Sequence, residues 1–482
     1  MGETLADLVA CEDVLMFVNA AITSTGQREF HHDGGDQGLS LEFLHEYMLY
    51  GYRDLYAAVL ALDINDHNAA MIVRNLLVHA AEADRERRRE EGLLIAARLA
   101  RLPQHRVLRL FRDLRRAGVN NRRTRAIQRD WLASRTDPAF DAVKYRGAVK
   151  DMIRHAHLRV EGELGTFLFA PHSRGSYRTP MFETWRRAHY EQAALYRLPY
   201  TVAEGFASKH GIPREVFLER IEPQMTRLER LRLQENAYVQ GSTRVRKPAG
   251  NVRTDLSGMP LTRLATYALA LPLDTRAERR EELTTALRAA ARKSAGPLAG
   301  RWGHVAAVLD DSFSTTGSGQ KRRRPLAVAL ACHYLLQALA ARYTPLWTSG
   351  RADELLLYPL GPTPLGERIL DALDTGPERL IIVSDGWDNA PPGLAAEVLR
   401  VWRTRLDPDR KVTITHLNPV YDADDFDVRR LTPTVPTAGV RDAEDLPTLI
   451  ELAGFAEGRT GLDDVRAYLG ERTARFTAGG RR

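Results

Sequence analysis

The chain has 482 residues, a formal net charge of +7, 44% hydrophobic residues and 27% charged residues. This length predicts two or three domains that each bury a core, and the composition excludes a largely disordered chain. No stretch approaches the roughly 18 uncharged apolar residues of a membrane helix. The first residues, MGETLADLVACEDVLMF, lack the positive charge of a secretory signal, and the only cysteines are Cys11 and Cys332. We therefore expect a cytoplasmic protein without a disulfide framework or cysteine-ligated zinc.

The chain up to residue 295 has the pattern of successive helices. Apolar residues recur at three- and four-residue spacing, as at Val73, Leu76, Leu77 and Ala80. Prolines and glycines fall between such segments, where helices end. Many helices of ordinary length joined by short turns favour an α-helical repeat array over a compact bundle, although no repeat period stands out.

After residue 295 the pattern changes to alternating strands and helices. Two short apolar runs that end in aspartate predict strands at 304–310 and 379–385, and 412–417 is a third strand candidate. Two helical segments lie between them, at 325–343 and 366–374. Such alternation predicts an α/β domain with a mostly parallel sheet. The expected division is therefore a helical domain over 1–295 and an α/β domain over 300–482.

A divalent-metal site is predicted at the carboxyl ends of these strands, where α/β sheets gather their binding groups. Hard oxygen ligands are offered by a D-x-S-x-S sequence after the first strand, a threonine in the loop GPTPLG, and an SDG sequence after a later strand. The predicted ligands are Asp310, Ser312, Ser314, Thr363 and Asp385. We expect Mg²⁺, with Mn²⁺ and Ca²⁺ as alternatives. D-x-S-x-S alone is also common in ordinary turns; the order of all three elements makes the pattern specific.

These residues resemble the metal-ion-dependent adhesion site of von Willebrand factor A domains. The resemblance implies a Rossmann-like von Willebrand factor A domain from about Trp302, with an open coordination position for a partner's carboxylate. Two features depart from the pattern: Thr315 stands where methionine is common, and the following loop, TTGSGQKRRR, is long and basic. We therefore expect either weak cation binding or an acidic partner docked on that basic loop.

The helical part resembles the TROVE module of Ro autoantigen-like proteins. The segment 137–162 carries the resemblance most closely, supported by 101–114, 118–131 and 257–271. It implies a ring of HEAT-like helical hairpins that binds small structured Y-like RNAs and single-stranded 3′ ends of misfolded RNAs, with an exoribonuclease as a partner. By position, Lys144 and His157 match residues used for RNA contact, and we add Arg146 and Lys150 from the same region.

Basic residues independently suggest an RNA-binding surface. Lys144, Lys150 and Arg154 are spaced to form a stripe, and His157 is suited to stack on an unpaired base. The stripe is extended by Arg115, Arg116, Arg122, Arg123 and Arg125. The alternative is that these arginines form a solvated face paired with nearby carboxylates, and that His157 is a packed or capping residue. His31-His32-Asp33 lies in a glycine-rich context that favours a loop over a metal cluster.

The sequence favours a noncoding-RNA-binding scaffold without catalysis of its own. The alternative is a metal-dependent adaptor that recruits a protein through the α/β domain. A third class, a phosphoryl hydrolase, is suggested by Asp310 after an apolar strand, as in haloacid-dehalogenase-like phosphatases. Those enzymes use D-x-D, however, whereas the second position here is Ser312 and no supporting lysine motif is visible.

Overall fold

The computed structural model describes residues 5–31, 34–173, 175–226, 229–230, 233, 256–446, 449–450 and 461–479. Contacts divide the chain into two compact units that are interleaved along the sequence. Unit 1 comprises residues 1–69 and 256–475, and unit 2 comprises 70–255 and 476–482. The predicted division into domains 1–295 and 300–482 follows the order of elements along the chain. Contacts between residues instead group the first 69 residues, and residues 256–295, with the sheet.

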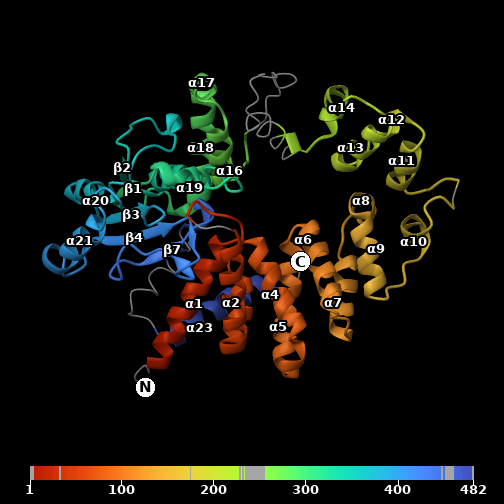
Figure 1. Cartoon of the computed structure of the whole chain (residues 1–482), viewed down its shortest axis with the longest axis horizontal. Helices are drawn as coiled ribbons and strands as arrows, with labels where there is room; N and C mark the ends of the chain where they lie inside the picture. Colours follow the sequence, from red (N-terminus) through yellow and green to blue (C-terminus); the bar gives the residue numbers. More distant parts are fainter. Residues whose placement is uncertain are drawn as a thin grey trace. The chain divides into compact units, whose positions relative to one another are not determined.

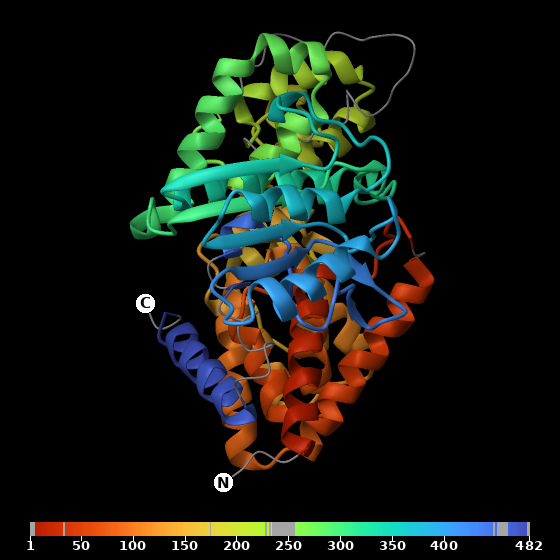
Figure 2. The ribbon, with the colours of Figure 1, turned by 90° about the vertical axis from the view of Figure 1, so that its left-hand side faces the viewer.

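The core of unit 1 is a five-stranded parallel sheet of strand order β2-β1-β3-β4-β7, counted over the described residues (Figure 1). Its strands are β1 (His304–Leu309), β2 (Arg342–Trp347), β3 (Arg379–Val383), β4 (Thr413–Asn418) and β7 (Thr437–Gly439). Leu309 pairs with Trp347 on one side and with Val383 on the other. These three strands therefore end at the same edge, and Figure 2 shows the strands running side by side.

All three strands predicted from the sequence are present, as β1, β3 and β4, and the helix predicted over 366–374 is present as α20 (Leu365–Asp374). The helix predicted over 325–343 is α19 (Arg324–Leu339), so its expected end was wrong. Residues 342–347 instead form the edge strand β2, which contains Pro345 and is only partly buried. Proline and partial exposure are typical of edge strands, which lack a continuous apolar run.

Helices cover both faces of the sheet. On one face, α20 and α21 (Leu394–Val401) bring Ile369 and Leu399 into a core with Val308 and Ile382. The other face carries α19, which is apolar around most of its circumference and almost wholly buried. Such a helix requires covering on all sides. In unit 1 this covering comes from α16 (Leu261–Ala270) and α18 (Arg280–Ala295).

The first helices of the chain also belong to unit 1: α1 (Leu5–Thr23), α2 (Gly34–Gly51) and α3 (Arg53–Ala58). The Asn19 side chain on α1 donates to Asp427 Oδ1 (3.0 Å) and accepts from the Gly439 N–H (2.9 Å). A Cβ at Gly439 would lie 2.8 Å from Thr23 Cγ2, so this approach requires glycine. Helix α1 thus packs along β7 and the small antiparallel pair β5 (Tyr421–Asp422) and β6 (Asp427–Val428), covering the sheet edge.

A buried arginine holds the segment before the sheet to unit 1. Arg276, on α17 (Leu273–Glu278), donates from its guanidinium to four carbonyls, those of Leu269, Leu271, Leu355 and Leu357. Burial lowers the pKa of Arg276 to about 10. Nearby, Thr262 on α16 donates its N–H to Glu444 (3.1 Å). The segment 257–271 therefore packs with the α/β sheet of unit 1.

Unit 2 is helical throughout its described residues. Its helices are α5 (Arg85–Arg101), α6 (Gln104–Arg116), α7 (Arg122–Ala133), α8 (Pro138–Lys144), α9 (Arg146–His155), α10 (Gly162–Phe169), α11 (Pro180–Ala188), α12 (Gln192–Leu195), α13 (Tyr200–Lys209) and α14 (Arg214–Ile221). Each packs mainly on helices close to it in the chain, as α6 does on α9 and α11 on α12. Such local packing is typical of an extended helical array.

Two further helices cross the division between the units, α4 (Asp66–Val78) and α23 (Leu462–Ala478). Helices thus precede a parallel α/β region, as the sequence predicts. Within the described ranges, no helix combines the length and apolar character needed to cross a membrane.

Candidate functional site

Two aspartates leave neighbouring strands at the same edge of the sheet. Asp310 directly follows β1, and its N–H donates to the carbonyl of Val383, the last residue of β3 (3.0 Å). Asp385 lies two residues beyond that strand end. Both side chains are buried, with residue exposures of 1% for Asp310 and 3% for Asp385. The parallel register therefore places two buried carboxylates at one edge.

The carboxylate of Asp310 is only partly hydrogen-bonded. Its Oδ1 accepts from the Ser312 N–H (2.9 Å) and from the Thr348 hydroxyl (3.2 Å), whereas its buried Oδ2 has no partner among the described residues. Burial, and next the charge of Asp385, raise the pKa of Asp310 well above its usual range. A buried carboxylate oxygen without a partner is costly, and a divalent cation would offset that cost.

Three predicted hydroxyl residues lie on loops that meet these aspartates. Ser312 Oγ and Ser314 Oγ are 3.2 Å apart. The Phe313 N–H donates to the Gly361 carbonyl (3.0 Å), which joins this loop to the loop that carries Thr363. The Thr363 N–H in turn donates to Asn389 Oδ1 (2.7 Å), on the loop that follows Asp385. The five predicted residues thus lie on three mutually hydrogen-bonded loops.

This donor set contains two carboxylates and three hydroxyls. Groups of three or more His, Cys, Asp and Glu side chains that would hold a metal do not occur in the described part of the chain. The set fits a hard cation, because Mg²⁺ and Mn²⁺ accept hydroxyl and water oxygens beside one or two carboxylates. The unpartnered Asp310 Oδ2 is the observation that supports this fit.

Neighbouring residues shape the site without joining the donor set. The Asp311 carboxylate accepts from the Thr348 hydroxyl and the Ser349 N–H, both at 2.8 Å, and so connects the ends of β1 and β2. Gly386 has φ +82°, and a Cβ there would lie 2.8 Å from the Arg429 carbonyl oxygen. Glycine is therefore required directly after Asp385. Thr348 and Asn389 were not anticipated, because no sequence motif connects them to the aspartates.

Most of the basic loop after the serines is engaged within unit 1. Lys321 forms a buried ion pair with Glu29, the Arg323 guanidinium donates to the Leu269 carbonyl, and Arg324 pairs with Asp442 (2.8 Å). Of the four consecutive basic residues, Arg322 is the exposed one. The loop therefore offers an acidic partner much less charge than its sequence suggests.

The His31-His32-Asp33 sequence was expected to form a loop without a metal role. His32 and Asp33 lie outside the described residues. His31, in the turn after α1, places its Nε2 3.6 Å from Asp385 Oδ2. Sequence reasoning missed this approach, because more than 350 positions separate the two residues along the printed sequence.

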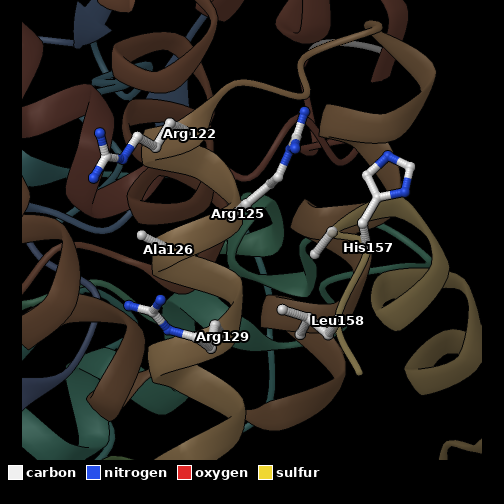
Figure 3. A pocket seen from close by; sticks show the side chains of 7 residues that line it. Arg122, Arg125, Ala126, Arg129, His157 and Leu158 are labelled. Carbon is white, nitrogen blue, oxygen red and sulfur yellow. The ribbon is translucent and has the colours of Figure 1, made fainter. Parts of the chain in front are cut away.

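Unit 2 contains a separate candidate site, an open cavity of about 620 Å³. Its lining residues are Arg122, Arg125, Ala126, Arg129, Ala156, His157 and Leu158. Figure 3 shows the three arginines along one helix, α7, with His157 and Leu158 on a neighbouring segment. Arg129 was not among the predicted RNA-binding residues. Its spacing from Arg122 and Arg125 is the signal that could have found it, because residues i, i+3 and i+7 share a helix face.

Asn120 connects the two sides of this cavity. Its side-chain oxygen accepts from Arg125 Nε (2.8 Å), and its amide nitrogen lies 3.2 Å from His157 Nε2. His157 is exposed and adopts φ +52°, a conformation rare for a residue with a side chain. These contacts orient a guanidinium and an imidazole beside the same open space.

Two of the predicted RNA-binding arginines instead have internal partners. Arg123 pairs with the buried carboxylate of Glu91 (3.2 Å) and donates to the Arg88 carbonyl (3.0 Å). Arg146 donates to the carbonyls of Phe167 and Leu168, and burial lowers its pKa. Both side chains therefore stabilise contacts between helices.

The predicted basic stripe is divided between two helices. Lys144 ends α8 and lies 3.9 Å from a Glu229 carboxylate oxygen, whereas Lys150 and Arg154 lie one turn apart on α9, both near the Phe169 ring. The last two predicted residues, Arg115 and Arg116, form exposed ion pairs with Asp151 (3.1 Å) and Asp113 (3.6 Å). Exposed pairs of this kind are weak, so phosphate groups compete with them readily.

No model of a known protein family matches this chain, and a search of curated proteins found no match either. The two candidate sites among the described residues differ in their chemistry. One site is a buried set of carboxylate and hydroxyl oxygens, and the other is an open cavity lined by arginines.

Proposed function

We propose that the protein is an RNA-binding scaffold that acts without catalysis of its own and binds RNA on the α7 face of unit 2. The observation that carries this proposal is the cavity lined by Arg122, Arg125, Arg129 and His157. Guanidinium groups bind phosphate in a bidentate manner, and several on one face supply affinity that is largely independent of sequence. The imidazole of His157 adds a flat surface on which an unpaired base can stack.

The class of RNA follows from the resemblance to Ro-like proteins. All residues that line the cavity come from 118–131 and 137–162, two of the segments that carry this resemblance. We propose small structured, Y-like RNAs and the single-stranded 3′ ends of misfolded RNAs as ligands. A HEAT-like ring, a monomeric state, a cytoplasmic location and an exoribonuclease partner belong to the same proposal.

The test is a binding titration with a labelled RNA hairpin that carries a single-stranded 3′ extension, at several salt concentrations. The variant Arg122→Ala/Arg125→Ala/Arg129→Ala should bind more weakly. The slope of log affinity against log salt should fall by about 2, because each lost phosphate contact on a single strand contributes about 0.7. His157→Ala should weaken binding to the extended hairpin more than to a blunt one.

The matched control is Arg186→Gln/Arg187→Gln, which removes two arginines of α11 that are paired with Glu183 and Glu191. This control should retain the affinity and the salt slope of the native protein. Binding that is undetectable or insensitive to salt, or equal losses in both variants, would overturn the proposal.

A second candidate function uses the metal-site residues of unit 1, and the unpartnered Asp310 Oδ2 supports it. We infer a von Willebrand factor A-like domain that holds a divalent cation, Mg²⁺ or Mn²⁺, with Asp310, Ser312, Ser314, Thr363 and Asp385. The bound cation would bridge to a carboxylate of a partner protein. Recovery of a protein partner that is lost on chelation, with no specific RNA recovered in either condition, would favour this adaptor function over the first.

A further inference from the structure

The turn between α1 and α2 lies against the loops that carry the candidate metal ligands. The backbone N–H of Arg28 donates to Gln320 Oε1 (3.2 Å). Next to it, Glu29 forms an ion pair with Lys321 in which the Glu29 side chain is 2% exposed and the Lys321 side chain 13%. A buried pair of this kind fixes position more than it adds stability. The turn is therefore anchored on the loop that follows the D-x-S-x-S sequence.

Beyond this anchor, two aromatic contacts bring the turn to the ligand loops. The Phe30 ring packs edge-on against Phe313, the residue between the two predicted serine ligands, with 5.8 Å between ring centroids. The His31 ring packs on Trp387, two residues after Asp385, with 4.7 Å between centroids and 30° between planes. Trp387 is held in turn by the Arg429 guanidinium, 3.9 Å from its ring centroid.

These contacts place a nitrogen donor beside the candidate site. His31 Nε2 lies 3.6 Å from Asp385 Oδ2, so both atoms are within reach of one cation. Imidazole nitrogen and carboxylate oxygen each bind a metal at about 2.0–2.2 Å, and two ligands of the same ion lie about 3 Å or more apart. The unpartnered Asp310 Oδ2, buried at the same edge, is an independent sign that this edge holds a cation.

We propose that His31 becomes an additional ligand when the cation binds, supplied in cis by the turn after α1; in the structure itself the described side chains do not yet form such a three-residue metal group. This inference rests on the metal site of the second candidate function and deepens it. The imidazole takes the coordination position that would otherwise be open to a partner's carboxylate. A carboxylate partner must then displace the His31 imidazole.

The proposal changes the metal that the site prefers. A site of carboxylates and hydroxyls alone suits Mg²⁺, Ca²⁺ or Mn²⁺, whereas an imidazole ligand shifts the preference toward Zn²⁺ and other transition metals, and favours Mn²⁺ over Mg²⁺. The competing interpretation is that His31 only forms an ion pair with Asp385. In that case a cation would displace the imidazole, and removal of His31 would leave metal affinity unchanged or raise it.

The experiment is electron spin-echo spectroscopy of Mn²⁺ bound to the full chain, which detects a directly coordinated ¹⁴N nucleus. The native protein should show ¹⁴N modulation, and His31→Ala should lose it. The dissociation constant for Mn²⁺ should rise about ten-fold or more in His31→Ala, the size seen when groups that support a metal site are removed. The affinity for Mg²⁺ should change less, because Mg²⁺ gains little from imidazole.

His172→Ala is the matched control, since it removes an exposed imidazole of unit 2; it should retain the modulation. Mn²⁺ binding without ¹⁴N modulation in the native protein, or modulation that survives in His31→Ala, would overturn the role of His31 while the metal site stands. Failure of the native protein to bind Mn²⁺, Zn²⁺ or Mg²⁺ would overturn the metal site itself, and this inference with it.

Discussion

The two candidate sites are built in opposite ways. Four of the five candidate metal ligands of unit 1 are buried, and they come from loops far apart in the sequence, of which two are brought together by the parallel register of β1 and β3. The arginines of unit 2 are exposed and come from one short helix, α7. In the first site a polar group must have a partner, because burial makes an unpaired one costly. In the second, helix periodicity alone decides which side chains share a face.

The run of arginines at the start of α7 shows how far that periodicity reaches. Arg122 and Arg125 line the cavity, whereas Arg123, between them in sequence, turns to the buried Glu91. Adjacent residues on a helix point about 100° apart, so one run of like charges serves two purposes. The contrast shows that the helix face on which an arginine lies, and whether that face is buried, decides whether the arginine pairs internally or lines the cavity.

The largest effect should follow the loss of the buried arginine of unit 1. Arg276→Ala leaves four carbonyl groups without their donor, and we expect the free energy of unfolding of unit 1 to fall by about 3 kcal/mol. Urea unfolding monitored by tryptophan fluorescence would measure this. The exposed Arg301 provides the control, and Arg301→Ala should change stability by less than about 0.5 kcal/mol. Equal losses of unfolding free energy in the two variants would show that the buried Arg276 contributes no more to stability than the exposed Arg301.

Next in size is the loss of a metal-site carboxylate. Asp310→Ala should weaken Mn²⁺ binding at least about 100-fold, equivalent to about 2.7 kcal/mol, because it removes one of two carboxylates. Equilibrium dialysis would measure this, with the exposed Asp409→Ala as the control. Binding of the labelled hairpin RNA should be unchanged in both variants. Joint loss of metal and RNA binding would show that the two sites are not separate.

A neighbouring pair of variants sharpens the comparison within unit 2. Arg123→Ala leaves the buried carboxylate of Glu91 without its ion pair and should lower the free energy of unfolding by about 2 kcal/mol. Arg122→Ala should leave stability within about 0.5 kcal/mol of the native protein but reduce RNA affinity. Thermal unfolding and the salt titration would separate the two. A loss of stability in Arg122→Ala, together with a loss of RNA affinity but not of stability in Arg123→Ala, would show that the two side chains do not lie on the helix faces seen in the structure.

A last effect, absent at neutral pH, concerns a buried histidine of unit 1. His45 contacts the Tyr56 hydroxyl (2.8 Å) and Asn68 Oδ1 (3.2 Å), and burial lowers its pKa to about 3. Because the folded pKa lies below the unfolded value of 6.5, this contribution to stability is complete above pH 6.5. It is lost as the pH falls from 6.5 toward 3, by up to about 1.4 kcal/mol per pH unit.

Urea unfolding between pH 7 and 5 would measure this slope, and the conservative variant His45→Gln should make it shallower. An unchanged slope in His45→Gln would assign the acid sensitivity to other groups. Because His45 is distant in sequence from the arginines of α7, RNA affinity at pH 7 should be the same in the variant and the native protein.

The sequence by itself determined the elements whose signals are local. Strands β1 and β3 are short, mostly apolar runs buried on both faces, β4 is rich in β-branched residues, and the loop residues Asp310, Thr363 and Asp385 follow from the order of strands and helices. The helical character of α6, α7 and α9 follows from apolar spacing in the same way. In each case the sequence signal lies within one strand, or within a few helical turns, of the residue whose place it predicts.

Tertiary structure decided whatever depends on contacts between distant segments. Three features have no local signal in the sequence: the partly exposed edge strand β2, the grouping of α1 and α16 with the sheet, and the approach of His31 to Asp385. The partner of Arg123 belongs to the same class, because Glu91 lies on another helix. Apolar periodicity records which face of an element is buried, but the residue that covers that face is chosen only when the whole chain packs.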